Sequence, residues 1–144
     1  MEISTKENEK LVSTVYESAM KALHGGREIT EQENFVFQVE LLSQEVNSGA
    51  SFEQYFRWVG KAEVDEILGH IQRLDAPQLY SIVEEAIRVA FPNGVSDDED
   101  GYERCTDWNE AQEERLQELF EKFEQYNGVI GNKLGQFIGT NELV

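Results

Sequence analysis

The 144-residue sequence contains little cysteine, proline or histidine, with one, two and two residues respectively. The single cysteine, Cys105, excludes an internal disulfide and is typical of a reducing compartment. No run approaches the roughly 18 consecutive apolar residues of a membrane helix. The polar start, MEISTKENEKL, lacks the apolar segment of a secretory signal. These absences predict a cytoplasmic protein without a membrane partner, and the composition is in the style of a bacterial protein.

Basic residues are also scarce, since 12 Lys and Arg stand against 29 Asp and Glu, a formal net charge of −17. Such a charge repels nucleic acid and anionic membranes, and it attracts cations or a basic protein surface. Solubility alone requires a net charge of only about 2–8 in a small domain. We therefore expect no direct nucleic-acid binding, while solubility and a basic protein partner remain as alternative explanations.

The motifs of catalysis and of cofactor binding are missing. There is no G-x-S-x-G, no H-E-x-x-H, no P-loop and no dinucleotide fingerprint. His24 and His70 are isolated from any nucleophile pattern, and the carboxylates around Cys105 disfavour a reactive thiolate. We expect no catalytic residue and no cofactor, so an enzyme is the weaker class.

The segment SDDEDGYERCTD invites comparison with a calcium-binding loop. If Gly101 takes the glycine position of such a loop, the pattern requires an Asp first, a hydrophobic eighth residue and a Glu last. The chain offers Ser96, Glu103 and Asp107 there. We expect no metal site, although weak divalent binding by the run Asp97, Asp98, Glu99 and Asp100 and a plain solvated loop both stay open.

Hydrophobic periodicity is helical almost throughout, and strand-like alternation is rare. The pattern predicts helices over residues 4–23, 31–46, a short stretch after Ser51, 61–74, 77–91 and 109–126. The glycine-rich end, VIGNKLGQFIGTNELV, predicts either a short helix around Leu134 to Ile138 or an irregular tail. The chain is thus predicted to be all-α, a compact single-domain bundle of about six to seven helices over residues 1–144, with an acidic loop near residues 95–108.

The expected apolar faces and boundaries follow from the same spacing. In the first two predicted helices the stripes are Leu11, Val15, Tyr16, Ala19 and Leu23, and then Phe35, Val36, Val39, Leu42 and Val46. In the helices predicted over residues 61–74 and 77–91 they are Val64, Ile67, Leu68, Ile71 and Leu74, and then Leu79, Ile82, Val83, Ala86, Ile87 and Ala90. The helix predicted over residues 109–126 has the stripe Leu116, Leu119, Phe120 and Phe123. Thr30 and Glu33 form a capping-box signature, Gly60 ends the short helix, and Asp75 is expected to cap the helix that follows.

The stretch QEVNSGASFEQYFRW has a turn followed directly by aromatic residues. Asn47 and Gly49 are predicted to adopt positive φ, and Phe52, Tyr55 and Phe56 share one helical face. The favoured interpretation is structural: the turn lets the rings dock on the second helix. The alternative is a small-ligand or enzyme site in which Asn47, Gln54 and Tyr55 line a polar pocket.

Acidic residues concentrate from residue 97 to residue 124, where twelve of them stand against three basic residues. Like charges at i, i+4 repel on a helix, and only Glu118 with Lys122 offers a favourable pair of that spacing. Functional sites are where such local rules tend to be broken. The predicted partner-binding surface comprises Asp97, Asp98, Glu99, Asp100, Glu103, Asp107, Glu110, Glu113, Glu114, Glu118 and Glu121.

The corner EVNSGASFEQYF resembles the E-x-N-N-G-G-F-x-Q-Y/F-F signature of a bacterial domain family named for DNA-mimic proteins. LDAPQLYSIVEEAIRVAFPNG and LQELFEKFEQY are similar to later helices of that family, and the resemblance covers roughly residues 35–138. Ser48 and Ala50 replace an Asn and a Gly of the signature, and Ser51 is an additional residue. The family-motif residues are Asn47, Gly49, Phe52, Gln54, Tyr55 and Phe56.

This resemblance implies an all-helical fold and, for some members, imitation of DNA charge. The expected function is therefore an acidic protein-binding module that occupies the basic surface of a DNA-binding protein such as a transcription factor. The sequence leaves open which protein that is, and whether the chain forms a homodimer.

Overall fold

The computed structural model describes residues 2–94 and 108–144. These residues form seven α-helices and one short 3-10 segment, and no β-strand occurs among them. The all-α prediction is confirmed. Two compact units emerge from the contacts: residues 1–41 with 125–144, and residues 42–124. Within the described ranges, no helix is long and apolar enough to cross a membrane.

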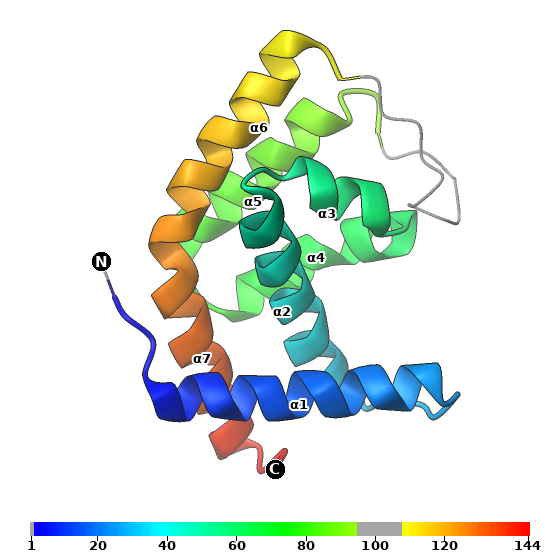
Figure 1. Cartoon of the computed structure of the whole chain (residues 1–144), viewed down its shortest axis with the longest axis vertical. Helices are drawn as coiled ribbons and strands as arrows, with labels where there is room; N and C mark the ends of the chain where they lie inside the picture. Colours follow the sequence, from blue (N-terminus) through cyan, green and yellow to red (C-terminus); the bar gives the residue numbers. More distant parts are fainter. Residues whose placement is uncertain (1, 95–107) are drawn as a thin grey trace. The chain divides into compact units, whose positions relative to one another are not determined.

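The first unit contains α1 (Lys6–His24), the first part of α2 (Glu31–Gly49) and α7 (Asn127–Thr140) (Figure 1). Thr5 caps α1, because its hydroxyl accepts the Asn8 N–H at 3.1 Å. The predicted stripe of α1 is partly wrong. Leu23 is 45% exposed and Leu11 is half-buried, while the buried residues are Val12, Val15, Tyr16, Ala19 and Ala22.

Helix α2 follows its prediction more closely. Thr30 and Glu33 form both bonds of the capping box, at 2.9 and 3.0 Å. All five residues of the predicted stripe are at most 1% exposed: Phe35, Val36, Val39, Leu42 and Val46. The helix continues three residues beyond the predicted end at residue 46 and stops at Gly49.

The corner after α2 differs from its prediction. Asn47 and Gly49 are helical, and the left-handed conformation belongs to Ala50, whose φ is 51°. Gly49 is needed for a different reason, because a Cβ there would lie 2.9 Å from the Cβ of Gln54. The glycine therefore permits close approach of the next helix rather than a positive φ.

The glycine-rich end also corrects the sequence prediction. The 3-10 segment Glu124–Tyr126 leads directly into α7, a regular helix of 14 residues. Gly128, Gly131 and Gly135 face the N-terminal segment, where added Cβ atoms would meet Glu2, Ser4 and Asn8. Close contact between α7 and the chain start thus offsets the low helix propensity of glycine.

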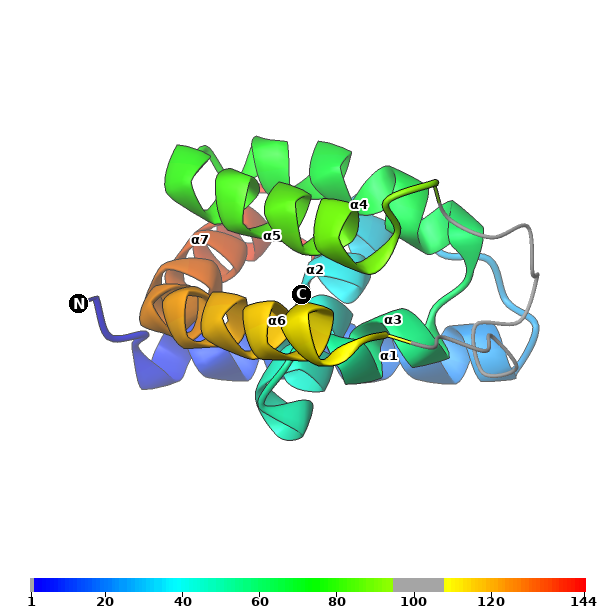
Figure 2. The ribbon, with the colours of Figure 1, turned by 90° about the horizontal axis from the view of Figure 1, so that it is seen from above.

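The second unit holds the rest of α2 together with α3 (Glu53–Trp58), α4 (Lys61–Arg73), α5 (Pro77–Ala90) and α6 (Glu110–Phe123). Helix α5 lies beside both α4 and α6 (Figures 1 and 2). Two boundary predictions are wrong. Gly60 is the N-cap of α4 rather than the end of α3, and Asp75 adopts a φ of 55° while Ala76 occupies the cap position of α5.

The aromatic corner forms the centre of this unit. Phe52, Tyr55 and Phe56 are completely buried. The Phe52 ring contacts Phe123 of α6 at 5.4 Å between centroids, and the Phe56 ring contacts Phe91 at the end of α5 at 5.2 Å. The rings therefore join α3 to α5 and α6. Leu68, Ile82, Ile87 and Phe120, predicted inward, are only half-buried.

Candidate functional site

Helix α6 has exposed glutamates on the surface that its buried stripe leaves uncovered. Leu116, Leu119 and Phe123 are at most 1% exposed and hold the helix on the core. Because an α-helix turns by 3.6 residues, glutamates at the intervening positions project outward. The exposed acidic residues of α6, together with Glu124 at the start of the 3-10 segment that follows it, are named here the glutamate face: Glu110, Glu113, Glu114, Glu118, Glu121 and Glu124.

The charges of this face are only partly compensated. Glu110, Glu113 and Glu114 make no ion pair with any described residue. Glu118 forms an ion pair, because Arg115 donates a hydrogen bond from Nη1 to Oε2 of Glu118 at 2.9 Å. The sequence predicts Lys122, at i+4, as the partner of Glu118, whereas in the structure Glu118 pairs with Arg115 at i−3.

Arg115 also joins two helices. Its Nε and Nη2 both lie 2.6 Å from Oε2 of Glu85 on α5. Hydrogen bonds to Glu85 and then to Glu118 raise the pKa of Arg115 above its usual value. The Glu85 contact spans 30 residues, so nothing in the local spacing could reveal it.

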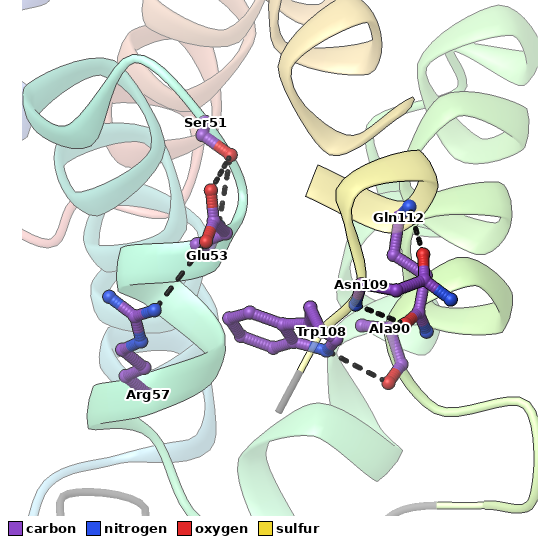
Figure 3. A network of polar contacts seen from close by, with 7 residues as sticks. All are labelled: Ser51, Glu53, Arg57, Ala90, Trp108, Asn109 and Gln112. Carbon is purple, nitrogen blue, oxygen red and sulfur yellow. Dashed lines mark hydrogen bonds and ion pairs between the residues drawn. The ribbon is translucent and has the colours of Figure 1, made fainter. Parts of the chain in front are cut away.

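The beginning of α6 is fastened by further side-chain bonds (Figure 3). Asn109 and Gln112 form a complete capping box, with bonds of 2.8 and 2.9 Å. Trp108 donates from Nε1 to the Ala90 carbonyl at 3.1 Å, and Gln112 donates from Nε2 to the Val89 carbonyl at 2.8 Å. These two donors satisfy terminal carbonyls of α5 that have no partner within their own helix.

Charge is unevenly distributed between the two units. Residues 42–124 contain 20 acidic and 7 basic residues, a net of −13, so only −4 of the total −17 belongs to the other unit. The predicted carboxylates Asp97, Asp98, Glu99, Asp100, Glu103 and Asp107 contribute to this count and lie outside the described residues, as does the segment compared with a calcium loop. The remaining predicted surface residues all lie on α6.

The polar residues of the corner bond to their own surroundings. Asn47 donates from Nδ2 to the Ser43 carbonyl at 2.7 Å, and Gln54 donates from Nε2 to Glu45 Oε2 at 2.7 Å. The Tyr55 hydroxyl is buried without a hydrogen-bond partner, and burial, followed by the charge of Glu63, raises the pKa of Tyr55. These contacts agree with the structural interpretation of the corner.

Open surface hollows in the described part of the chain include two that lie away from the corner. One, of about 600 Å³, lies along the end of α1, and the other, of about 340 Å³, lies at the start of α5. Neither is lined by Asn47, Gln54 or Tyr55. Among the described residues, no group of three or more His, Cys, Asp or Glu is arranged to hold a metal ion.

The family model described as DMP19-like protein matches residues 27–141. The matched range includes the corner and α6, it extends the resemblance found over residues 35–138, and it leaves α1 outside. No curated protein and no solved structure matches the chain.

Proposed function

Because the chain belongs to the DMP19-like protein family, a family of DNA mimics, we propose that it is an acidic protein-binding module that occupies the basic nucleic-acid-binding surface of a partner. The proposed partner is a DNA-binding protein such as a transcription factor, in the cytoplasm of a bacterium. The observation that carries this proposal is the outward glutamate face of α6.

The spacing of the charges supports the proposal. Glu110 and Glu124 are 14 residues apart, which corresponds to about 21 Å along a helix at 1.5 Å per residue. Six carboxylates over this length give one charge about every 4 Å, close to the ~3.4 Å per charge along one DNA strand. A basic groove that accommodates a phosphate strand would therefore meet carboxylates at a similar spacing, of which Glu118 is already paired with Arg115.

The rigidity of α6 supports it as well. The capping box, the bonds of Trp108 and Gln112 to α5 and the Arg115–Glu85 ion pair hold the helix at both its start and its middle. A charged surface that is already ordered loses less conformational entropy when it binds. The glutamates thus need only side-chain adjustments to contact a partner.

The proposal is tested by capture experiments with two variants of equal charge. In the first, Glu110, Glu113, Glu114 and Glu124 are changed to Gln. In the control, four exposed glutamates of the other unit are changed to Gln: Glu7, Glu17, Glu28 and Glu142. Immobilised wild type should retain a DNA-binding protein from native lysate at low salt, and duplex DNA bearing that protein's own site should release it.

The expected result is that the α6 variant loses the captured protein and the control variant keeps it. Loss of a complementary charge should mainly slow association and reduce its salt dependence, which surface plasmon resonance measures on the purified partner. Equal weakening by both variants would indicate an effect of net charge alone. Capture of a partner that DNA does not displace would contradict mimicry.

A further inference from the structure

One of the chain's own cations lies among the carboxylates of the glutamate face. Arg115 of α6 donates from Nη1 to Oε2 of Glu118 at 2.9 Å. The Nε and Nη2 atoms of Arg115 each lie 2.6 Å from Oε2 of Glu85 on α5. These three residues, named here the arginine triad, belong to a single unit. Arg115 therefore occupies a carboxylate that a basic partner would otherwise contact.

The two contacts of Arg115 are separate from each other. Glu118 is bound through Nη1, whereas Glu85 is bound through Nε and Nη2, so Glu118 can be released without breaking either contact to Glu85. The Glu118 side chain is 58% exposed, and that of Glu85 is 33% exposed. Since water and salt screen an exposed pair more strongly, the contact to Glu118 is the weaker of the two.

Charge balance favours the exchange of Arg115 for a partner's cation at Glu118. Two carboxylates and one guanidinium give the arginine triad a net charge of −1, so the triad still attracts a cation. A lysine or arginine that binds Glu118 makes the group neutral. Without Glu85, Arg115 and Glu118 would already be neutral together, and the guanidinium would repel an added cation. Glu85 thus restores to the glutamate face the charge that Arg115 removes.

We propose that Arg115 is an internal competitor at the partner-binding surface, and that it yields Glu118 to a lysine or arginine of the partner while Glu85 retains it. This inference rests on the proposed function, because it describes how the same surface binds its partner. Release of Glu118 costs part of the free energy that the new ion pair supplies. Arg115 therefore disfavours isolated cations and favours basic surfaces that contact several carboxylates at once. Glu85 acts through Arg115 and is a positioning residue for the glutamate face.

The test uses octa-lysine as a basic probe, titrated into the full chain by calorimetry. Glu85→Gln leaves Arg115 with Glu118 as its remaining ion-pair partner among the described residues, so octa-lysine should bind more weakly. The matched control is Glu84→Gln, which removes one charge from the same helix and whose ion pair, at 3.9 Å, is with Arg88. We expect Glu85→Gln to weaken binding about two- to fivefold more than the control does, the range of one exposed ion pair. When Arg115→Met is added, the two variants should weaken binding equally, because the competitor is absent.

A second readout follows the arginine triad by nuclear magnetic resonance in the wild-type chain. Octa-lysine should shift the side-chain carboxyl carbon resonance of Glu118. The Arg115 Nε–H resonance, assigned with Arg115→Lys, should stay in place because Glu85 still accepts its hydrogen bond. Movement of that resonance toward the position of exposed arginines such as Arg88 would overturn the inference.

The titrations can also overturn the inference by themselves. Equal weakening by Glu85→Gln and Glu84→Gln, with wild-type circular dichroism spectra for both, would show that Arg115 does not compete for Glu118. Absence of any captured DNA-binding protein would instead overturn the proposed function, since the measurements with octa-lysine do not depend on it.

Discussion

Two residues of the aromatic corner are conformationally or chemically unfavourable where they stand. Ala50 adopts a left-handed conformation with a φ of 51°, at the position where the resembling signature has a glycine. Tyr55 buries a hydroxyl that has no hydrogen-bond partner, at a position where the signature accepts tyrosine or phenylalanine. For each of these two residues we therefore expect one substitution to be tolerated or stabilising.

Replacing Ala50 with Gly should stabilise the protein. A left-handed alanine costs about 1–2 kcal/mol, and the additional freedom of glycine in the unfolded chain costs about 0.4–1 kcal/mol. The net gain should be about 0.5–1 kcal/mol in the free energy of unfolding, measured by urea denaturation. Gly49→Ala is the matched control, and it should destabilise because its Cβ would lie 2.9 Å from that of Gln54. A lower midpoint for Ala50→Gly would argue against the left-handed conformation.

Replacing Tyr55 with Phe should leave the stability equal or increase it at neutral pH. An unpaired buried hydroxyl costs about 1–3 kcal/mol, and phenylalanine removes the hydroxyl while keeping the ring. Because burial raises the pKa of Tyr55, the folded protein keeps this phenol protonated at a pH where the unfolded chain ionises it.

The phenol of Tyr55 should also make the free energy of unfolding depend on pH under alkaline conditions. Below the unfolded pKa of about 10, both states are protonated and the stability is fully present. Above it, the unfolded state releases a proton that the folded state retains, so stability falls by up to about 1.4 kcal/mol per pH unit. Urea titrations at pH 8 and pH 11 should show that the advantage of Tyr55→Phe grows with pH. Parallel pH profiles would show that the phenol ionises in the folded state.

At the scale of elements, α7 is stabilised by what lies against its glycines. Asn132 accepts hydrogen bonds from the Thr5 N–H and from Asn8, and it donates to Glu2 and to the Ile3 carbonyl, at 2.8–3.0 Å. All four hydrogen-bonding positions of this amide are used. The N-terminal segment is therefore part of the first unit, although the family match begins only at residue 27.

Two glycines of α7 should respond in opposite directions to alanine. At Gly135 a Cβ would lie 2.5 Å from the Asn8 Cβ, so Gly135→Ala must displace α1 and should cost about 1–3 kcal/mol. An added Cβ at Gly139 would have no atom within 4 Å beyond its chain neighbours and the backbone of its own helix, so Gly139→Ala should stabilise the helix by about 0.5–1 kcal/mol. Thermal unfolding of the two variants measures both effects. Stabilisation by both would mean that the chain start does not contact α7.

At the scale of the whole molecule, the net charge of −17 opposes folding through self-repulsion. Salt shortens the Debye length from about 30 Å at 0.01 M to about 3 Å at 1 M, so repulsion between surface carboxylates should fade over this range. We expect the melting temperature to rise by several degrees with sodium chloride, roughly 2–8 °C for a gain of about 1–2 kcal/mol.

The glutamate face should account for part of that response. With Glu110, Glu113, Glu114 and Glu124 changed to Gln, the low-salt melting temperature should move toward the high-salt value, because repulsion along α6 is reduced. Differential scanning calorimetry at several salt concentrations would measure this shift in the melting temperature of the variant. A melting temperature that falls with salt would instead indicate that ion pairs such as Arg115–Glu85 dominate the electrostatic contribution.

Sequence alone was sufficient for features that depend on residues three or four positions apart. The helical class, the stripe of α2, the Thr30–Glu33 capping box and the exposure of Glu110, Glu114, Glu118 and Glu121 all follow from the period of the helix. Such features need no information about distant parts of the chain, because each helix presents its faces in the same order wherever it packs.

Only the tertiary structure decided the features in which local preferences nearly balance. The glycines of α7 favour a break, yet contacts with a segment more than 120 residues earlier make it a helix. Arg115 pairs with Glu85 across 30 residues, and the left-handed conformation of the corner falls on Ala50 instead of Asn47 or Gly49. In each case the local free-energy differences are about 1 kcal/mol per residue, which a single long-range contact is large enough to reverse.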